Sequence, residues 1–523
     1  MSFARSAPYL RLLGPWALAA ALAAPSLAQQ PPPSIELALG NWDSGRVENL
    51  GQRPDVVISR TVHVEGAEWL RIAFNAVELA GNPDAGTGAI LRITSFADGA
   101  VQELNAVQLA EWQYTSAYFN GDTVQIDVEA KPNTGASRVA LGRAWAGIGG
   151  GTKSQCGPTD NRVLSSDARQ GRALPIGCTA WLFDDCKHCM GTAGHCSTSS
   201  LQVIEFNVPL STATGALNHP SPDDQYAVDV SSKQSQNSGI GFDWGYFGVF
   251  ANSNTGLFPY QKQAAWYQLV TPPAFSGGAT IRITGYGVDS TPNQNNQVQQ
   301  TSTGPWTLLS GTRLEYQVDT EGGNSGSPVV FESSGQVIGV HTNAGCSTSG
   351  GSGANSGTGR NNSGWVSALA SPKGVCNGAG SSTTYCTAKL NSQFCAPTIS
   401  AIGSPTTTGG SGSFNIVSSQ QLNNANGLLI YGFQSASTPF QGGFLCVGGQ
   451  IVRTTLQNSG GTAGSPDCSG TYTFDMGGLI SSGNDPGLIS GATVYTQYWG
   501  RDNLQAPPNT SSLTQGLRFT IGC

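Results

Sequence analysis

The stretch GNSGSP at residues 323–328 decides how this sequence is interpreted, once it is paired with the stretch TAGHC at residues 192–196. The first stretch supplies a hydroxyl at Ser325 and the second an imidazole at His195. A serine hydroxyl is a weak nucleophile at its free pKa, so it needs a neighbouring imidazole as base and a third group that orients the imidazole. Together the two stretches predict a nucleophile and its base.

Small residues surround the predicted nucleophile. Glycines on either side of Ser325 let the backbone turn tightly. The amide hydrogens of Gly323 and Ser325 can then point at the oxygen that becomes negative during acyl transfer, which is an oxyanion hole. In a chain with 70 glycines such a hexapeptide is also an ordinary turn, so the prediction depends on the pairing with His195. The apolar run at residues 179–183 predicts a strand leading toward that histidine.

Both stretches resemble the active-site motifs of the chymotrypsin-like serine proteases, over residues 154–380. The likeness is greatest to the bacterial branch with the glutamyl endopeptidases and the staphylococcal V8 protease, whose nucleophile segment and following strand are similar to residues 319–329 and 340–343. Asn324 stands where animal members usually carry an aspartate, and the bacterial branch often shows the same substitution. The resemblance implies a double β-barrel, peptide hydrolysis through an acyl-enzyme, and no requirement for a metal or organic cofactor.

Two aspartates compete for the role of third group. Asp243 opens a run of aromatic and β-branched residues, and Asp229 lies within the run YAVDV. The resembled family usually presents its acid at the head of such a strand, so Asp243 is the predicted member and Asp229 the alternative. Its expected role is to hold the imidazole in the correct tautomer without taking the proton.

The resemblance also implies which residues bind the substrate side chain. In glutamyl endopeptidases a histidine on the later strand and a threonine before the nucleophile bind a carboxylate, and His341 and Thr320 match those positions. Asp319 lies six residues before Ser325, where trypsin-like members carry the acid that selects Lys or Arg. Lysyl endopeptidases also carry the later histidine. We therefore expect a preference for Glu or Asp, with a Lys/Arg preference or a broader one as alternatives.

Twelve cysteines fit an oxidising compartment. The protease resemblance implies a disulfide between Cys178 and Cys196, on either side of the segment that delivers His195. The stretch CKHC at residues 186–189 admits a zinc site, with His188 and the nearby His195 as possible ligands. A local disulfide in an extended loop is the preferred interpretation of that stretch.

Five cysteines lie near the end of the chain. Cys386 and Cys395 are expected to form a short bridge, whereas the partners of Cys446, Cys468 and Cys523 cannot be deduced from sequence.

The first 28 residues have the pattern of a signal peptide. Two arginines precede an apolar run that ends in Ser26-Leu27-Ala28, so cleavage is expected after Ala28. The run is too short and wrongly flanked for a membrane anchor. We expect a secreted, extracellular bacterial protein that does not insert into a membrane.

Length predicts three folded units after the signal. Residues 29–150 contain short β-rich runs at 56–62, 69–74 and 124–128 with turn signals between them, so a β-sandwich is expected there. The glycine-rich stretch at 149–153 is typical of a flexible linker. In the resembled family a pro-segment precedes the catalytic domain, so the first unit is either a removable pro-domain, making the chain a zymogen, or a retained accessory domain.

The last unit, residues 386–523, is predicted to be β-rich. Short apolar runs at 427–432 and 493–499 alternate with glycine turns, after a turn-rich joint at 404–410. Tyr498 and Trp499 are candidates for binding a glycan or a peptide surface, although such aromatics more often lie in a core.

Charge excludes some partners. The net charge is −7, the pI is about 5.3, and the chain has no basic cluster. It therefore lacks the electrostatic footprint of a nucleic-acid-binding protein.

Two classes of function remain open. The first is an active endopeptidase that acts on proteins or peptides. The second is an inactive binding protein that uses the protease fold, because a fold does not imply activity.

Overall fold

A computed structural model of the chain describes residues 31–40, 42–147, 156–347, 353–377, 382–407 and 409–522. The predicted signal peptide at 1–28 and the predicted linker at 149–153 lie outside the described residues. Within the described ranges, no helix is long and apolar enough to cross a membrane.

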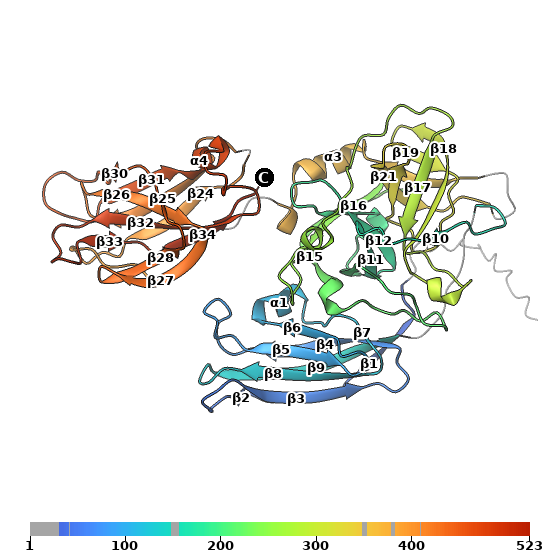
Figure 1. The fold of residues 1–523 in the computed structure, drawn as a ribbon, viewed down its shortest axis with the longest axis horizontal. Coiled ribbons are helices and arrows are strands. Elements are labelled where there is room, and N and C mark those ends of the chain that lie inside the picture. Colours follow the sequence, from blue (N-terminus) through green and yellow to red (C-terminus); the bar gives the residue numbers. More distant parts are fainter. Residues whose placement is uncertain are drawn as a thin grey trace, which may run out of the picture.

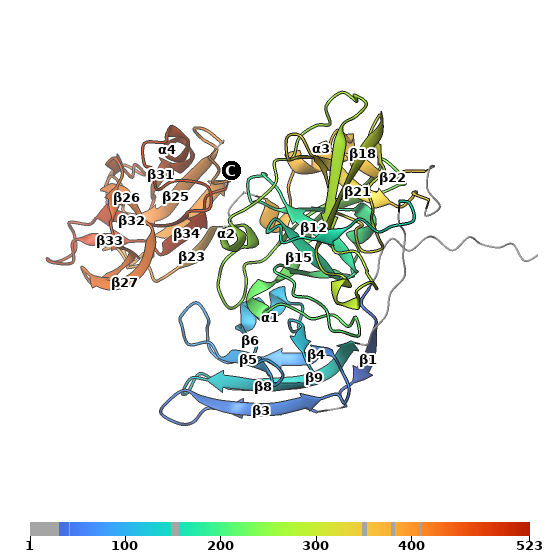
Figure 2. The ribbon, with the colours of Figure 1, turned by 45° about the vertical axis from the view of Figure 1, so that its right-hand side comes forward.

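The chain forms three β-rich units that follow one another along the sequence (Figure 1). The N-terminal sheets lie beneath the central unit in both views, and the C-terminal sheets lie beside it (Figure 2). Helices are few and short: α1 Ala106–Glu111, α2 Pro259–Gln263, α3 Ser363–Ala370 and α4 Met476–Ser482. The mostly β fold predicted from the sequence is confirmed.

The first half of the central unit is a closed six-stranded barrel in the order β11-β12-β13-β16-β15-β14. Antiparallel pairing of β11 with β14 closes it. The strand predicted at 179–183 is β12, and all five of its residues are buried. The strands are β11 Gln170–Pro175, β12 Cys178–Leu182, β13 Met190–Thr192, β14 Leu201–Glu205, β15 Gln225–Asn237 and β16 Asp243–Val249.

The second half of the central unit closes in the same way. Its sheet runs β18-β17-β20-β21-β22-β19, and β19 also pairs with β18, which completes a second six-stranded barrel. A short strand, β10, adds to its edge along β18. The bounds are β10 Val163–Leu164, β17 Thr280–Gly285, β18 Gln300–Ser310, β19 Arg313–Tyr316, β20 Pro328–Phe331, β21 Gln336–Asn343 and β22 Asn355–Gly359.

The N-terminal unit is a pair of sheets that share one apolar core, as the sequence predicted. Period-2 alternation explains this, since β8 buries every second residue toward the opposite sheet. One sheet contains β1 Ser34–Ala38, β2 Val47–Glu48, β4 Trp69–Glu78, β7 Phe119–Asn120 and β9 Ala136–Gly147. The other contains β3 Asp55–His63, β5 Ile90–Ser95, β6 Val101–Leu104 and β8 Thr123–Ala130.

The C-terminal unit has its own core between two main sheets, with a hairpin beside them. The larger sheet contains β23 Ser382–Tyr385, β26 Asn426–Gly432, β29 Val452–Arg453, β30 Gln457–Asn458, β32 Thr493–Arg501, β33 Ser511–Leu513 and β34 Gly516–Thr520. The smaller sheet contains β24 Thr398–Gly403, β25 Phe414–Gln421 and β31 Gly470–Asp475, and the hairpin contains β27 Gln434–Phe440 and β28 Gly443–Gly448.

The expected local disulfide in the stretch 186–189 is wrong. Cys189 pairs with Cys376, which is 187 residues away and follows α3. Cys186 is also disulfide-bonded. The turn Gly374–Cys376 packs against β15 and β16, and β16 pairs with β13, the strand that Cys189 precedes. A disulfide depends on that spatial approach rather than on distance along the chain.

The expected short bridge between Cys386 and Cys395 is also wrong. Cys386 pairs with Cys446 and Cys395 with Cys468, across Cα separations of 6.1 and 6.4 Å. Each bond thus joins the start of the C-terminal unit to a later part of it, a pairing that sequence spacing does not show.

Candidate active site

His195 lies in a short 3-10 turn, Gly194–Cys196, directly after β13 of the first barrel. Gly194 is required there, because a Cβ at this position would lie 1.8 Å from the carbonyl oxygen of Gln236. Asp243 is the first residue of β16, next to β13 in the barrel. Neighbouring strands of one barrel therefore deliver the imidazole and the carboxylate to the same place.

Both carboxylate oxygens of Asp243 hold His195. Oδ1 accepts the backbone N–H of His195 at 2.9 Å, and Oδ2 lies 2.6 Å from Nδ1 of its ring. The Asp243 side chain is almost wholly buried and the His195 side chain is 15% exposed. With Asp243 ionised, Nδ1 carries the proton, so Nε2 is left as the acceptor that a general base needs.

The rival aspartate is engaged elsewhere. Asp229 Oδ1 accepts from the backbone and hydroxyl of Ser231, and Oδ2 accepts the backbone N–H of Val375 at 2.8 Å. The structure brings Asp243, rather than Asp229, to the imidazole.

Ser325 lies in the turn between β19 and β20 of the second barrel. Its carbonyl oxygen accepts the N–H of Thr179 at 2.9 Å and lies 3.7 Å from Sγ of Cys196. A ring nitrogen of His195 lies within 4.8 Å of both sulfurs of the Cys178–Cys196 disulfide, which is formed as the resemblance implied. The serine turn and the imidazole therefore border the same disulfide, at the junction of the two barrels.

The turn around Ser325 depends on two glycines with positive φ. At Gly323, where φ is +101°, a Cβ would lie 2.5 Å from the carbonyl oxygen of Tyr286. At Gly326, where φ is +90°, a Cβ would lie 2.2 Å from the carbonyl oxygen of Thr179. Other residues would strain this backbone and collide with the backbone of Tyr286 or Thr179.

Two amides of this turn point to an acyl-transfer site. Within the part of the chain that the structure describes, the backbone N–H groups of Gly323 and Ser325 donate to no protein acceptor. The amides of Asn324 and Gly326, by contrast, bond to the carbonyl oxygens of Glu321 and His341. The N–H groups of Gly323 and Ser325, which lie beside the serine hydroxyl, can therefore donate to a developing oxyanion.

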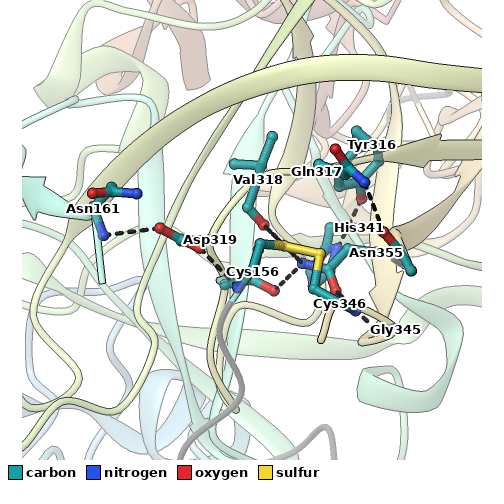
Figure 3. Close-up of a disulfide and its surroundings, with 12 residues drawn as sticks. Cys156, Asn161, Tyr316, Gln317, Val318, Asp319, His341, Gly345, Cys346 and Asn355 are labelled. Atoms are coloured by element: carbon teal, nitrogen blue, oxygen red, sulfur yellow. Dashed lines mark hydrogen bonds between the residues drawn. A yellow bond between two sulfur atoms is a disulfide. The ribbon is translucent and has the colours of Figure 1, made fainter. Parts of the chain in front are cut away.

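Asp319 does not present its carboxylate as a trypsin-like acid would. Oδ1 accepts the backbone N–H of Cys156 and Oδ2 that of Asn161, each at 2.8 Å (Figure 3). Cys156 is in turn bonded to Cys346. Both oxygens thus anchor the segment that enters the central unit, and the residue is 4% exposed.

Thr320 is held by an amide that the sequence analysis missed. Asn355, the first residue of β22, donates from Nδ2 to Thr320 Oγ1 at 2.9 Å and to the Val318 carbonyl oxygen at 2.7 Å. Its Oδ1 accepts the backbone N–H of Gly345. Asn355 therefore joins the segment before the nucleophile to the loop after β21.

His341 lies on β21 and is buried against Tyr316 of β19 (Figure 3). The phenolic oxygen of Tyr316 is 2.8 Å from His341 Nδ1. Burial, with a contribution from His195, lowers the pKa of His341 to about 3, so its ring is neutral at neutral pH. Burial also raises the pKa of Tyr316 well above its usual value, so its hydroxyl keeps its proton.

These two states determine where the His341 proton lies. The Tyr316 hydroxyl has no other acceptor among the described residues, so it donates to Nδ1. A neutral imidazole that accepts at Nδ1 carries its hydrogen on Nε2. Sequence reasoning missed Tyr316, because its contact with His341 is created by the closure of the barrel and has no spacing signal.

The zinc interpretation of the stretch 186–189 loses its main ligands. His188 stacks on Trp266 with ring centroids 4.0 Å apart. Cys189 is a half-cystine and has no thiolate to offer a metal.

The two aromatic candidates of the C-terminal unit have different positions. Tyr498 lies in the core and donates its hydroxyl to the Ile416 carbonyl oxygen, so it cannot contact a glycan. Trp499 lines a cavity of about 290 Å³ together with Phe440 and Arg453. A ligand site on this unit would have to use that cavity rather than Tyr498.

No family model matches the chain. Solved structures with some similarity include a Glu endopeptidase at 19% identity, covering 40% of this chain and 96% of that one with a TM-score of 0.32. A thermostable serine protease from an extremophilic microorganism has 14% identity, with 35% and 82% covered and a TM-score of 0.27. Protease Anisep from Arthrobacter nicotinovorans has 15% identity, with 38% and 92% covered and a TM-score of 0.28. The fold assignment stands on the strand pairing, since two closed six-stranded barrels are the fold of the chymotrypsin-like serine proteases.

Proposed function

We propose that this protein is a serine endopeptidase that uses Ser325, His195 and Asp243. The proposal rests on the two hydrogen bonds between Asp243 and His195. Asp243 Oδ2 lies 2.6 Å from Nδ1 of the ring, and Oδ1 accepts the backbone N–H at 2.9 Å. This pair borders the same disulfide as the Ser325 turn. An orienting carboxylate, a base and a hydroxyl in a glycine-shaped turn are the parts that acyl transfer needs.

The reaction follows from these parts. His195 Nε2 takes the proton of the Ser325 hydroxyl while Oγ attacks the peptide carbonyl carbon, and the amides of Gly323 and Ser325 stabilise the oxyanion. The C–N bond then breaks, and the imidazolium returns the proton to the leaving amine. Water, deprotonated by the same imidazole, attacks the acyl-enzyme and releases the acid product. These reaction steps use only side chains, backbone amides and water.

For substrate preference, we infer Glu or Asp on the acyl side of the cleaved bond. A buried carboxylate is tolerated only where donors satisfy it. His341 can offer its Nε2–H, and Thr320 lies on the segment that enters the nucleophile turn. The Lys/Arg alternative is less well supported, because both oxygens of Asp319 already accept backbone amides.

The test of this function is to map cleavages in a diverse peptide mixture by mass spectrometry, comparing wild type with Ser325→Ala. Cuts after Glu or Asp that vanish in the variant support both activity and preference. Serine-dependent cuts after Lys or Arg would overturn the acidic preference alone. No serine-dependent cuts would favour the inactive binding protein.

Asp319→Asn separates the two preferences. An amide replaces one acceptor oxygen with a donor facing a backbone N–H, so we expect a loss of about 1–3 kcal/mol in the free energy of unfolding. The set of cleaved bonds should stay the same as in wild type. Denaturant unfolding measures the first effect and peptide mapping the second. Selective loss of cuts after Lys or Arg would show instead that Asp319 reads the substrate.

Tyr316→Phe tests the His341 tautomer. Without the hydroxyl, the proton is no longer held on Nε2, so kcat/KM for a Glu substrate should fall about tenfold, the equivalent of one hydrogen bond. The matched substrate with Gln should change less. Tyr286→Phe is the control, because this buried tyrosine donates instead to the Gln170 carbonyl oxygen. An equal loss for the Glu and Gln substrates would contradict a role in specificity.

We further propose that the protein acts outside the cytoplasm. Five disulfides join described cysteines, and such bonds persist in oxidising compartments. The signal-peptide pattern that ends at Ala28 points to export. Amino-terminal sequencing of the secreted protein tests both its export and the expected cleavage after Ala28.

A further inference from the structure

Three strands of the first barrel present apolar side chains to two different cores. Leu174, Val203 and Ala227 are cross-strand neighbours on β11, β14 and β15. All three belong to the core of the N-terminal sheets. The adjacent residues on the same strands, Ala173 and Ile204, belong to the interior of the barrel.

This division follows from strand geometry. Successive side chains of a strand point to opposite faces, so a barrel strand with both faces apolar must be covered on its outside. The N-terminal sheets provide that cover, because Leu174, Val203 and Ala227 belong to their core, and these sheets lie beneath β15 in both views (Figure 1; Figure 2). Without them, Leu174 and Val203, which are fully buried, would face water.

Polar groups match across the same surface. The Asn120 side chain accepts the backbone N–H of His219 at 2.8 Å and donates to its carbonyl oxygen at 3.0 Å. The Gln225 side chain makes the reciprocal pair with the backbone of Tyr118, each bond at 2.8 Å. Paired backbone contacts of this kind fix the register of the two surfaces.

A buried ionic cluster lies directly under the contact. Glu205 accepts from Arg172 at 2.6 Å and from His219 Nδ1 at 2.7 Å, and all three side chains have no exposed surface. The His219 ring stacks on Tyr118 of the N-terminal unit with centroids 4.6 Å apart. Burial lowers the pKa of His219, so the ring remains neutral and Arg172 balances Glu205. Part of the cover that keeps this cluster dry comes from the N-terminal sheets.

We propose that residues 31–147 are a permanent, non-covalently docked part of the protein, which stays bound even when the chain is cut between Gly147 and Cys156. A pro-domain that leaves after cleavage would expose the apolar face of β11, β14 and β15 and the cluster beneath it. The partner that fits this surface is the N-terminal unit of this chain, and the mature form therefore contains two units that act as one. The proposal stands independently of peptidase activity.

The experiment inserts a recognition sequence for a highly specific protease between Gly147 and Cys156 of the full chain and cuts the folded protein. The two fragments should co-elute in size-exclusion chromatography at micromolar concentration without denaturant. Fragments that separate under these conditions would overturn the proposal.

Val203→Asp tests the surface itself. A carboxylate in the apolar contact should release the N-terminal fragment after cutting, raising the dissociation constant at least about a hundredfold. Val230→Asp is the matched control, because Val230 lies on β15 and is 51% exposed, so its cut form should still co-elute. Co-elution of the Val203→Asp fragments with wild-type affinity would contradict the docking surface.

Asn120→Ala tests the same docking surface if the Val203→Asp protein does not fold before it is cut. Loss of the two hydrogen bonds to the His219 backbone should weaken association of the fragments about tenfold or more. An unchanged dissociation constant would contradict the docking surface.

Discussion

Ser325→Ala should lower the turnover of peptide hydrolysis by about four or more orders of magnitude, with the fold intact. The hydroxyl is the only group that the substitution removes. The turn itself is held by backbone contacts that alanine keeps, among them the bond from Thr179 N–H to the Ser325 carbonyl oxygen. The residual rate would come from binding and the oxyanion amides. Steady-state kinetics on a Glu peptide measure the loss of turnover, and thermal unfolding measures whether the fold is intact.

Ser327→Ala is the matched control for that variant. Ser327 lies in the same turn, is fully buried, and loses the same atom. Its variant should keep kcat within a few-fold of wild type. Undiminished activity in purified Ser325→Ala protein, or an equal loss in Ser327→Ala, would refute the assignment of the nucleophile.

Asp243→Asn should lower kcat by about three to four orders of magnitude, the size of effect seen when a triad carboxylate becomes an amide. Oδ1 can still accept the backbone N–H of His195, but an amide NH2 would replace Oδ2 opposite Nδ1. That group donates, so Nδ1 must accept and the proton moves to Nε2. The imidazole can then no longer receive the Ser325 proton.

Asp229→Asn controls for the loss of a buried carboxylate in the same barrel. Asp229 holds the backbone of Ser231 and Val375, so its variant should lose stability and keep kcat close to wild type. The comparison requires kcat and the free energy of unfolding for both variants. A larger loss of kcat in Asp229→Asn than in Asp243→Asn would reverse the assignment.

The docked N-terminal unit bears on how such kinetics should be measured. The outer face of β14 is covered by the N-terminal sheets, and β14 follows the turn that carries His195. Variants should therefore be compared in the full chain. Activity that survives cutting between Gly147 and Cys156 would be the property of a two-chain enzyme.

The sequence predicted well the features that depend on local chemistry. The glycines around Ser325 and the strand at 179–183 follow from backbone sterics and residue periodicity, and the structure has them where they were expected. The sandwich strands at 56–62, 69–74 and 124–128 were found for the same reason.

Cysteine pairing was predicted poorly where it depended on proximity in sequence. Cys189 and Cys395 each found partners far along the chain, at Cys376 and Cys468. A disulfide forms where folding brings two sulfurs together, and many pairings satisfy the same sequence. Only the arrangement of the sheets selects among them.

The direction of a side chain was likewise beyond the sequence. The sequence position of Asp319 is compatible with binding a Lys or Arg side chain of the substrate. Its carboxylate oxygens instead accept the backbone N–H groups of Cys156 and Asn161. Tyr316 carries no motif, and its contact with His341 exists because β19 and β21 both pair with β22 in the closed barrel.

The sequence by itself therefore determined which reactive groups this protein carries, namely a hydroxyl, an imidazole and candidate acids. It also determined which segments are strands with an apolar face. Tertiary structure decided which acid faces the imidazole, which cysteines meet, and what covers the outer face of the first barrel. The physical reason is that residue type and spacing govern contacts within a few residues along the chain. Contacts between distant parts of the chain, such as those of Leu174 with the N-terminal core, depend on how the closed barrels and stacked sheets bury all their apolar faces together.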